Sequence, residues 1–323
     1  MHVLVTGATG FVGLSIAQRL ATYGESVVAL DRDAPDAAAT QFLSAEQGRL
    51  RFVRGDVRDR AALIELVQRE GIQRIVHAAA LTPTPDDERA DPAAVIDVNL
   101  VGTLNLLEAA RHGAVERLVF VSSTAVYGSP EGRPLPIHED QALTAKGMYA
   151  VAKHASEQLC ARYAELYRMS IAVGRLGSAY GPTERRTASR RRMSQVYALA
   201  HAALDGRVIT IAGAGLLRDV CYIDDVAEAF ARLTRTNQLR WPVYNVSAGE
   251  AHSLHAIALA LAELVPGFSW REANNVADAD LVVLPPNARG PLDLSRLHAD
   301  TGFVPAYPLP QGLRRYLQWL RAA

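Results

Sequence analysis

A tyrosine and a lysine stand four residues apart, as Tyr149 and Lys153, in a stretch whose apolar residues recur at helical spacing. Residues four apart lie on one face of a helix. A phenol can exchange a proton with a substrate oxygen near neutral pH when a neighbouring ammonium group lowers its pKa. The pair therefore predicts acid–base chemistry, and its plain alternative is an ordinary Tyr/Lys pair on a helix surface.

Hydroxyl side chains occur together in Ser122-Ser123-Thr124, at the predicted end of a strand. Ligands of an open parallel sheet bind beyond the carboxyl ends of its strands. A hydroxyl at this place can bond the same substrate oxygen as the phenol. The alternative interpretation is a hydroxyl-rich turn.

Three glycines, Gly7, Gly10 and Gly13, lie between a predicted strand and a predicted helix. Glycine permits a tight turn there and lets the backbone approach a pyrophosphate, which the free N–H groups and the dipole at the helix N-terminus attract. The loop, with Phe11 and Val12 inside it, is therefore a candidate binding site for a dinucleotide.

A carboxylate, Asp31, ends the second predicted strand 18 residues after Gly13. It can accept both ribose hydroxyls and it repels a 2′-phosphate, which favours NAD over NADP. Arg32 argues the other way, because a guanidinium can pair with that phosphate. Two further segments are assigned to the cofactor, Asp56-Val57 at the adenine edge and Ala78-Ala79-Ala80 as a backbone-lined floor.

These residues need a frame of alternating strands and helices. Strands are predicted at 2–6, 26–30, 50–54, 74–78 and 117–122, and helices at 11–23, 60–70, 95–111 and 149–168. The repeated βαβ pattern predicts a Rossmann-type, doubly wound parallel sheet of the α/β class. We assign residues 1–174 to a dinucleotide-binding domain, and residues 175–323 mainly to a smaller substrate-binding lobe with some segments that return to the sheet.

The order of these motifs resembles the extended short-chain dehydrogenase/reductase family, which includes NAD-dependent epimerases and dehydratases. Asn99 in Val98–Thr103, the run Ser122–Gly128, and the later segments 179–182, 218–226 and 244–246 extend the resemblance over nearly the whole chain. The resemblance implies that Tyr149 is the catalytic acid/base, that Lys153 lowers its pKa and that Ser123 is the catalytic hydroxyl. It also implies a supporting role for Asn99 beside the cofactor and the active-site helix.

The chain departs from the family pattern at two places. Family members that dehydrate nucleotide sugars carry Asp-Glu directly after the catalytic hydroxyl, whereas this chain has Thr124-Ala125. This argues against 4,6-dehydration and leaves Thr124, with Ser123, as a predicted substrate contact. Nucleotide-sugar epimerases commonly carry an asparagine where this chain has Ser178. That substitution weakens the case for a nucleotide sugar.

Arginines suggest an anionic substrate. Arg218 matches the family arginine that pairs with a substrate phosphate, and Ser178 with Arg192-Met193-Ser194 is similar to the carboxylate-binding region of uronate dehydrogenases in the family. The run from Arg185 to Arg192 holds five arginines. It is either a solvated basic loop or a binding site for a carboxylate or phosphate, which guanidinium groups bind bidentately.

Composition excludes several other classes of protein. The 323 residues are 49% hydrophobic and 21% charged with a formal net charge of zero, which suits a soluble globular enzyme and not a nucleic-acid binder. We find neither a signal peptide nor a membrane span and expect a cytoplasmic protein. Two cysteines and the histidine spacing indicate no disulfide framework and no metal site.

The sequence therefore predicts an NAD-dependent epimerase or oxidoreductase that transfers a hydride at a secondary alcohol of an anionic sugar or nucleotide sugar. The alternative is a dehydrogenase of a sugar acid or hydroxy acid, which releases NADH after one transfer. A non-catalytic NAD-binding protein is a third reading, against which the Ser/Tyr/Lys set argues. The alanine-rich faces of helices 95–111 and 149–168 suggest a homodimer with a four-helix interface.

Overall fold

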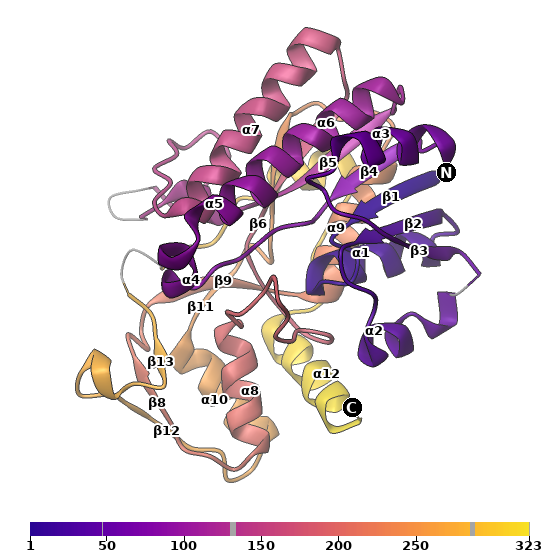
Figure 1. The fold of residues 1–323 in the computed structure, drawn as a ribbon. Helices are drawn as coiled ribbons and strands as arrows, with labels where there is room; N and C mark the ends of the chain where they lie inside the picture. The colour runs from indigo at the N-terminus through magenta and orange to yellow at the C-terminus, as the bar shows by residue number, and fades with distance from the viewer. Residues whose placement is uncertain (47, 130–133, 285–287, 323) are drawn as a thin grey trace.

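The computed structural model describes residues 1–46, 48–129, 134–284 and 288–322. In this part of the chain the largest sheet has seven parallel strands, in the order β10-β6-β5-β4-β1-β2-β3 (Figure 1). The strand order reverses between β1 and β4, which is where such sheets bind ligands. The strands are β1 (His2–Thr6), β2 (Ser26–Asp31), β3 (Leu50–Arg54), β4 (Arg74–His77), β5 (Arg117–Ser123), β6 (Ile171–Leu176) and β10 (Val243–Val246).

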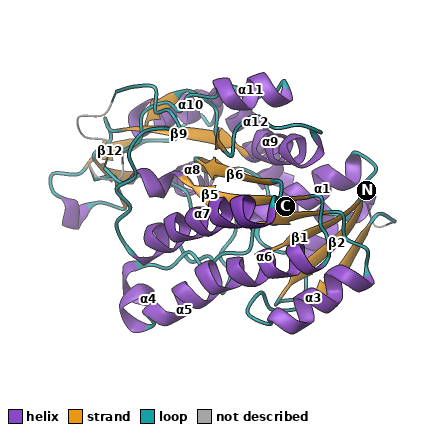
Figure 2. Cartoon of the chain, turned by 90° about the horizontal axis from the view of Figure 1, so that it is seen from above, coloured by secondary structure: helices purple, strands orange, loops and turns teal. Residues whose placement is uncertain are grey.

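Helices cover both faces of this sheet (Figure 2). Val3 and Val5 of β1 pack into the apolar core of one face and Leu4 into that of the other, as the two-residue period of a strand requires. The first face is covered by α1 (Phe11–Thr22), α9 (Ile223–Arg235) and α11 (Ser295–Thr301), and the second by α3 (Arg60–Arg69), α6 (Gly102–His112) and α7 (Met148–Tyr167). This is the doubly wound α/β fold that the sequence predicts.

The helix predicted at 95–111 is longer and interrupted. It starts with α5 (Pro92–Ile96), capped by the Asp91 side chain, passes through the π turn η2 (Asp97–Val101) and continues as α6. π turns within helices frequently occur at functional sites. By length and composition the stretch Pro92–His112 is apolar enough to cross a membrane, but 56% of its apolar 18-residue window is buried inside the fold.

The C-terminal half builds a second lobe with its own apolar core. Among the described residues it contains two sheets of three strands, ordered β11-β9-β7 and β12-β8-β13. Its elements are β7 (Ser178–Tyr180), α8 (Gln195–Leu204), β8 (Ile209–Ala212), β9 (Leu217–Tyr222), β11 (Ala251–Ser253), α10 (Leu254–Leu264), β12 (Trp270–Glu272), β13 (Leu281–Val282) and α12 (Leu309–Ala322). Strand β10 returns to the central sheet beside β6, and residues 174 and 175, where we divide the chain, both lie within β6.

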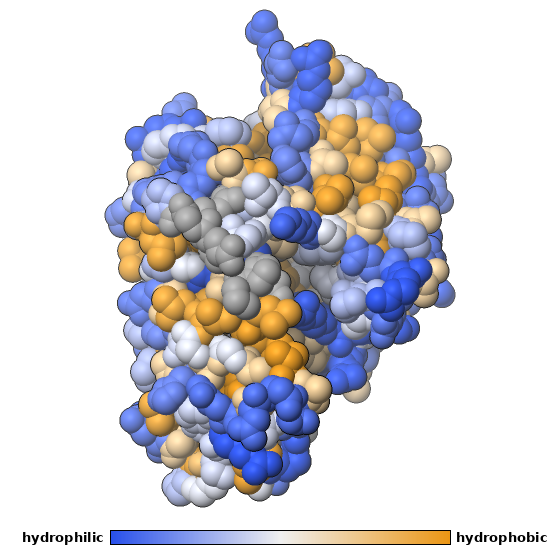
Figure 3. Space-filling view, turned by 90° about the vertical axis from the view of Figure 1, so that its left-hand side faces the viewer, coloured by the Kyte–Doolittle hydropathy of each residue, from blue (hydrophilic) through white to orange (hydrophobic). Residues whose placement is uncertain are grey.

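Short elements complete the described structure. The Asp36 side chain caps α2 (Ala37–Phe42), and Thr84 and Asp87 form a capping box on α4 (Pro85–Ala90). The single turns are η1 (Ser44–Glu46), η3 (Thr124–Tyr127) and η4 (Val276–Asp278). Figure 3 shows one face of the molecule, on which hydrophobic residues gather in limited areas between hydrophilic ones.

Candidate active site

A cavity of about 620 Å³ lies beyond the carboxyl ends of the central strands. Its lining comes from both lobes. With one exception, every residue predicted to bind cofactor or substrate lines it: Gly7, Gly10, Phe11, Val12, Gly13, Asp31, Asp56, Val57, Ala78, Ala79, Ala80, Ser123, Thr124, Tyr149, Lys153, Ser178, Arg192 and Arg218. Residues from nine segments of the chain therefore meet in one space.

The glycine loop fits a dinucleotide because it leaves room for backbone only. Gly7 has a φ of +68°, and a Cβ atom there would lie 2.7 Å from the backbone of Ala79. A Cβ atom on Gly13 would collide with the carbonyl oxygen of Gly7. Helix α1 has Gly10 as its N-cap and no side-chain hydrogen bond at that end. Its first N–H groups thus stay available for an anion such as pyrophosphate.

The carboxylate of Asp31 faces the glycine loop. It accepts hydrogen bonds from the backbone N–H of Thr9 at 2.9 Å and of Arg32 at 2.7 Å. The exposed Arg32 side chain pairs instead with Asp33, at 3.5 Å. The acid is thus held beside the loop where a ribose would lie, as the preference for NAD requires.

The carboxylate of Asp56, assigned to the adenine edge, already has a partner. Arg58 binds it through Nε at 3.1 Å and through Nη2 at 2.6 Å, and this hydrogen bonding lowers the pKa of Asp56. Val57 next to it is buried against Gly102. Asp56 and Arg58 both line the cavity, so an adenine bound here would meet this ion pair and not a free carboxylate.

Asn99 is the exception, since it is not among the described residues that line the cavity. Its side chain is fully buried and bonds the backbone of Leu81 in both directions, at 2.8 and 2.9 Å. Its carbonyl oxygen accepts a hydrogen bond from Ser156 of α7 at 2.9 Å. Asn99 therefore braces the loop after β4 and the active-site helix, and its contact with the cofactor stays a prediction.

Tyr149 and Ser123 approach each other at the end of β5. Burial raises the pKa of Tyr149, while a hydrogen bond with Ser123 and the positive charge of Arg190 lower it. The Ser123 hydroxyl also accepts the N–H of Ala125 at 3.2 Å. A serine hydroxyl and a phenol beside a cation can hold one substrate oxygen and exchange its proton.

Lys153 lies beneath this pair and is 1% exposed. Its Nζ donates to the carbonyl oxygen of Val121 at 2.8 Å and lies 5.9 Å from the centre of the Tyr149 ring. Burial lowers the pKa of Lys153 to about 8. The Lys153 ammonium group is thus directed toward the carbonyl oxygen of Val121 in the sheet, and its effect on the pKa of the phenol stays a prediction.

A buried polar network anchors the active-site helix to the sheet. Glu157, one turn after Lys153, accepts hydrogen bonds from Ser122 at 2.5 Å and from Arg175 at 2.7 Å. Arg175 continues to the hydroxyl of Tyr127, which donates to Asn245 of β10 at 2.7 Å. The sequence analysis missed Glu157, although it shares the helical face of Tyr149 and Lys153 at the same four-residue interval.

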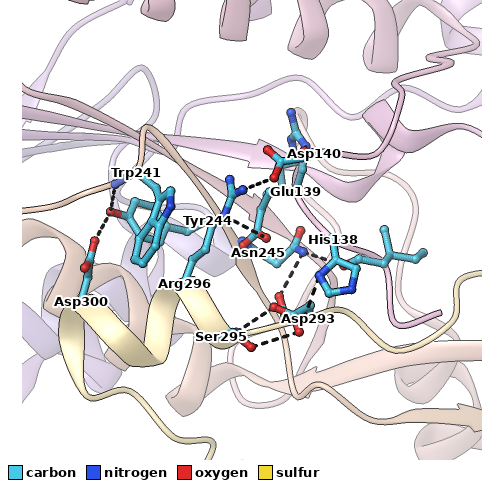
Figure 4. Close-up of polar contacts among 12 residues, drawn as sticks. His138, Glu139, Asp140, Trp241, Tyr244, Asn245, Asp293, Ser295, Arg296 and Asp300 are labelled. Atoms are coloured by element: carbon cyan, nitrogen blue, oxygen red, sulfur yellow. Dashed lines mark hydrogen bonds and ion pairs between the residues drawn. The ribbon is translucent and has the colours of Figure 1, made fainter. Parts of the chain in front are cut away.

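The network extends behind the site to the segment before α11 (Figure 4). The buried carboxylate of Glu139 accepts the backbone N–H of Asn245 at 2.8 Å and has Arg296 3.7 Å away, while burial raises its pKa. His138 lies 3.7 Å from Asp293, in line with a structural role for this histidine. These contacts join three distant segments at the end of β10.

Three arginines gather at the other end of the cavity. Arg218 donates to the hydroxyl of Ser178 at 2.8 Å, and burial together with the charges of Arg289 and Arg192 lowers its pKa to about 10. Arg289 was not predicted; the hydrogen bond from its backbone N–H to Leu217, at 2.8 Å, places it beside Arg218. Such a group of guanidinium ions favours a phosphate or carboxylate.

The basic run 185–192 is not simply a solvated loop. Three of its arginines bind carboxylates: Arg185 binds Asp36 at 2.6 Å, Arg190 binds Glu184 at 2.6 Å and Arg191 binds Asp87 at 2.7 Å. Arg192 lines the cavity with Arg218. The ion pairs of Arg185 and Arg191 therefore join the second lobe to the first, whereas that of Arg190 lies within the segment.

The fold and this site define an NAD-binding Rossmann protein with a Ser/Tyr/Lys set. Residues 3–247 match the NAD dependent epimerase/dehydratase family, to which the chain belongs. Membership confirms the predicted family and NAD as the cofactor.

Individual relatives extend over the whole chain. The chain is 32% identical to the UDP-glucose 4-epimerase of Mycolicibacterium smegmatis, with 99% of each chain covered. It is 29% identical to a probable UDP-glucuronate 4-epimerase of Rhizobium meliloti, over 99% of this chain and 96% of the relative. The crystal structure of the Thermus thermophilus UDP-glucose 4-epimerase in complex with NAD superposes with a TM-score of 0.83 at 30% identity, over all of both chains.

Proposed function

We propose that the protein is an NAD-dependent 4-epimerase of a nucleoside-diphosphate sugar, with a UDP-linked hexuronic acid as its first candidate substrate. The observation that carries the proposal is the division of one cavity into a glycine loop, a Ser123/Tyr149 pair and a cluster of three arginines. Relatives described as epimerases of UDP-glucose and UDP-glucuronate support this choice.

The arginine cluster suits the diphosphate of such a substrate. Arg218 and Arg289 come from two segments of the second lobe, and Ser178 adds a hydroxyl to them. Burial and the charges of Arg289 and Arg192 lower the pKa of Arg218, so an anion placed among the three guanidinium groups relieves their repulsion. In this assignment Ser178 takes the place that asparagine has in other epimerases.

Arg190 suits a carboxylate on the sugar. Its charge lowers the pKa of Tyr149, and it lines the same cavity as the phenol. Its Nη2 is bound to Glu184, but its buried Nε has no hydrogen-bond partner among the described residues. A uronic acid would supply one beside the reacting hydroxyl.

The chemistry of the chain follows from these positions. Bound NAD supplies the hydride acceptor and donor. Tyr149 takes the proton of the 4-hydroxyl group and returns it at the end of the cycle, while Ser123 holds the oxygen by a hydrogen bond. In this proposal Lys153, which lines the cavity one turn after the phenol, would bind the ribose hydroxyls of NAD. The cavity must also let the oxidised sugar turn before it is reduced on its other face.

Dehydration is disfavoured by the residues after Ser123. A 4,6-elimination needs an acid next to the catalytic hydroxyl, and here Thr124 and Ala125 line the cavity. Glu88 also lines it, but its carboxylate accepts the backbone N–H of Met148 at the start of α7. The Glu88 carboxylate thus holds the start of α7.

A sugar-acid dehydrogenase is the second candidate. It is favoured by Ser178 in place of asparagine and by the exposed Arg192 at the same end of the cavity. It uses the same Ser123, Tyr149 and Lys153, so only the substrate and the fate of NADH separate the two functions.

The test supplies UDP-glucuronate, UDP-galacturonate, UDP-glucose and free galacturonate in parallel. We expect NMR to show interconversion of the two UDP-uronates without accumulation of NADH. The variant Tyr149→Phe should lower kcat by about 1,000-fold, since it removes the proton-transfer group, and should leave NAD affinity unchanged. NADH released from free galacturonate, with no isomerisation of any UDP-sugar, would overturn the epimerase proposal in favour of the dehydrogenase.

We also infer a cytoplasmic homodimer formed through α5, α6 and α7. Apolar side chains on this side of the fold are exposed, among them Val101, Val151 and Leu166. Such residues are consistent with a covered helix face. Light scattering that gives the mass of one chain would contradict the dimer.

A further inference from the structure

A segment of the second lobe, residues 183–194, crosses the cavity and contacts the cofactor half at four places. We call it the strap. Arg185 and Arg191 bind Asp36 and Asp87 by ion pairs, while Ser189 and Arg190 contact the loop after β4. The strap also contributes lining residues to the cavity. It therefore forms one wall of the space in which NAD binds.

The ends of the strap are tied to each other. The buried carboxylate of Glu184 accepts hydrogen bonds from the backbone N–H of Ser194 at 2.7 Å and from its hydroxyl at 2.8 Å. Within the loop, Thr187 donates its backbone N–H to Arg190 at 2.9 Å. The strap is thus a closed loop with its own framework, which can act as a unit.

Arg185 joins the strap to the glycine loop. Its Nη2 donates to the carbonyl oxygen of Thr9 at 2.9 Å, its Nε binds Asp36 at 2.6 Å, and its Nη1 donates to Thr183 at 3.1 Å. All three nitrogen atoms of the guanidinium therefore have oxygen acceptors from the protein. This arrangement is that of a latch between two segments and not of a ligand for phosphate.

The other end of the strap is held near the catalytic residues. Ser189 accepts hydrogen bonds from the N–H of Thr82 at 2.9 Å and from its hydroxyl at 3.1 Å. The Arg190 guanidinium lies 5.2 Å from the centre of the Phe11 ring, at the start of α1. The strap is therefore attached on both sides of the place where α1 receives the pyrophosphate.

We propose that the strap closes over bound NAD and that Arg185 is a positioning residue that keeps it closed, so that the cofactor stays bound between turnovers. This goes beyond the proposed function and requires only that the chain binds NAD. It holds whichever sugar is the substrate.

The test measures how fast the dinucleotide leaves. Each protein is loaded with fluorescent etheno-NAD and mixed with excess NAD in a stopped-flow instrument. We expect Arg185→Gln to release the probe about tenfold faster, since charged hydrogen bonds across the cavity are lost. Asp36→Asn should act in the same direction with a smaller effect, because asparagine still caps α2 and only the ion pair is lost.

Controls separate the latch from general effects of charge and folding. Arg186→Gln removes an exposed neighbouring arginine and should leave the release rate unchanged. Arg185→Lys should give an intermediate release rate, because an ammonium group cannot bind two acceptors with the fork geometry of a guanidinium group. The double variant Arg185→Gln/Asp36→Asn should release the probe no faster than Arg185→Gln, since both changes break one pair. Added salt should speed release from the parent protein more than from Arg185→Gln.

An unchanged release rate in a folded Arg185→Gln variant, or equal acceleration by Arg186→Gln, would overturn the proposal. If Arg185→Gln does not fold, Asp36→Asn decides in the same assay: unchanged release refutes the latch and faster release supports it. None of these measurements uses a sugar. Failure of the latch is therefore distinct from failure of the epimerase proposal, which the isomerisation assay tests.

Discussion

The two halves of the cavity are built in different ways. The cofactor half uses backbone N–H groups and one strand-end carboxylate, which the loop from Gly7 to Gly13 and Asp31 supply within a short stretch of chain. The substrate half uses the side chains of Arg192, Arg218 and Arg289, brought together by tertiary structure. The first half depends on close approach of backbones and the second on charge. Substitutions in the first half should therefore weaken the binding of NAD, and substitutions in the second half should weaken the binding of the substrate.

The largest effect is expected from filling the close contact in the cofactor half. In Gly13→Ala the new methyl group would collide with the carbonyl oxygen of Gly7, so α1 must shift away from its loop. We expect NAD affinity to fall by about 100-fold and stability by about 3 kcal/mol. Calorimetric titration with NAD and thermal melting measure both. Gly48→Ala is the control, because a Cβ atom at Gly48 would meet nothing within 4 Å. Unaltered NAD binding in Gly13→Ala would show that the cofactor half does not depend on the close approach of backbones.

A smaller and different effect is expected from removing a charge in the substrate half. Arg218→Leu should raise the KM for a UDP-sugar by about 30-fold and leave the Kd for NAD unchanged, since a charged hydrogen bond to substrate is lost while the glycine loop is intact. Arg207→Leu is a suitable control, because Arg207 is exposed, lies outside this cavity and pairs with Asp205. Weaker NAD binding in Arg218→Leu would show that the halves are coupled.

The smallest effect concerns Arg190, which lies between the halves. Its charge lowers the pKa of Tyr149, so Arg190→Gln should raise that pKa. The limb of the kcat–pH profile that requires the phenolate should move to higher pH, so activity below this limb falls. Arg190→Lys retains the charge and should restore the profile. A profile that stays in place in Arg190→Gln means that Arg190 does not act on the phenol.

The same contrast explains how far sequence could predict the molecule. The alternation of strands and helices and the glycine spacing are local, so the sheet and the cofactor loop could be predicted closely. Arg289 could not, because it reaches Arg218 through one backbone hydrogen bond between segments about 70 residues apart. The buried direction of the Asn99 side chain within the π turn could not be predicted either, because a motif gives a position in the chain but not the direction of a side chain. The direction of the Lys153 side chain could not be predicted from the sequence, because it depends on the hydrogen bond to the carbonyl oxygen of Val121 in the sheet.

The anchoring of α7 limits how the proposed epimerase can work. Glu157 fixes the helix to β5 and β6 through Ser122 and Arg175, so the phenol two turns earlier keeps one place above the sheet. A catalytic group that cannot swing from one side of a sugar to the other leaves the rearrangement to the sugar. In the proposed reaction the ligand is the moving part and the protein its fixed frame. Inversion at the reacting carbon then requires that the oxidised sugar can rotate inside a cavity whose walls stay in place.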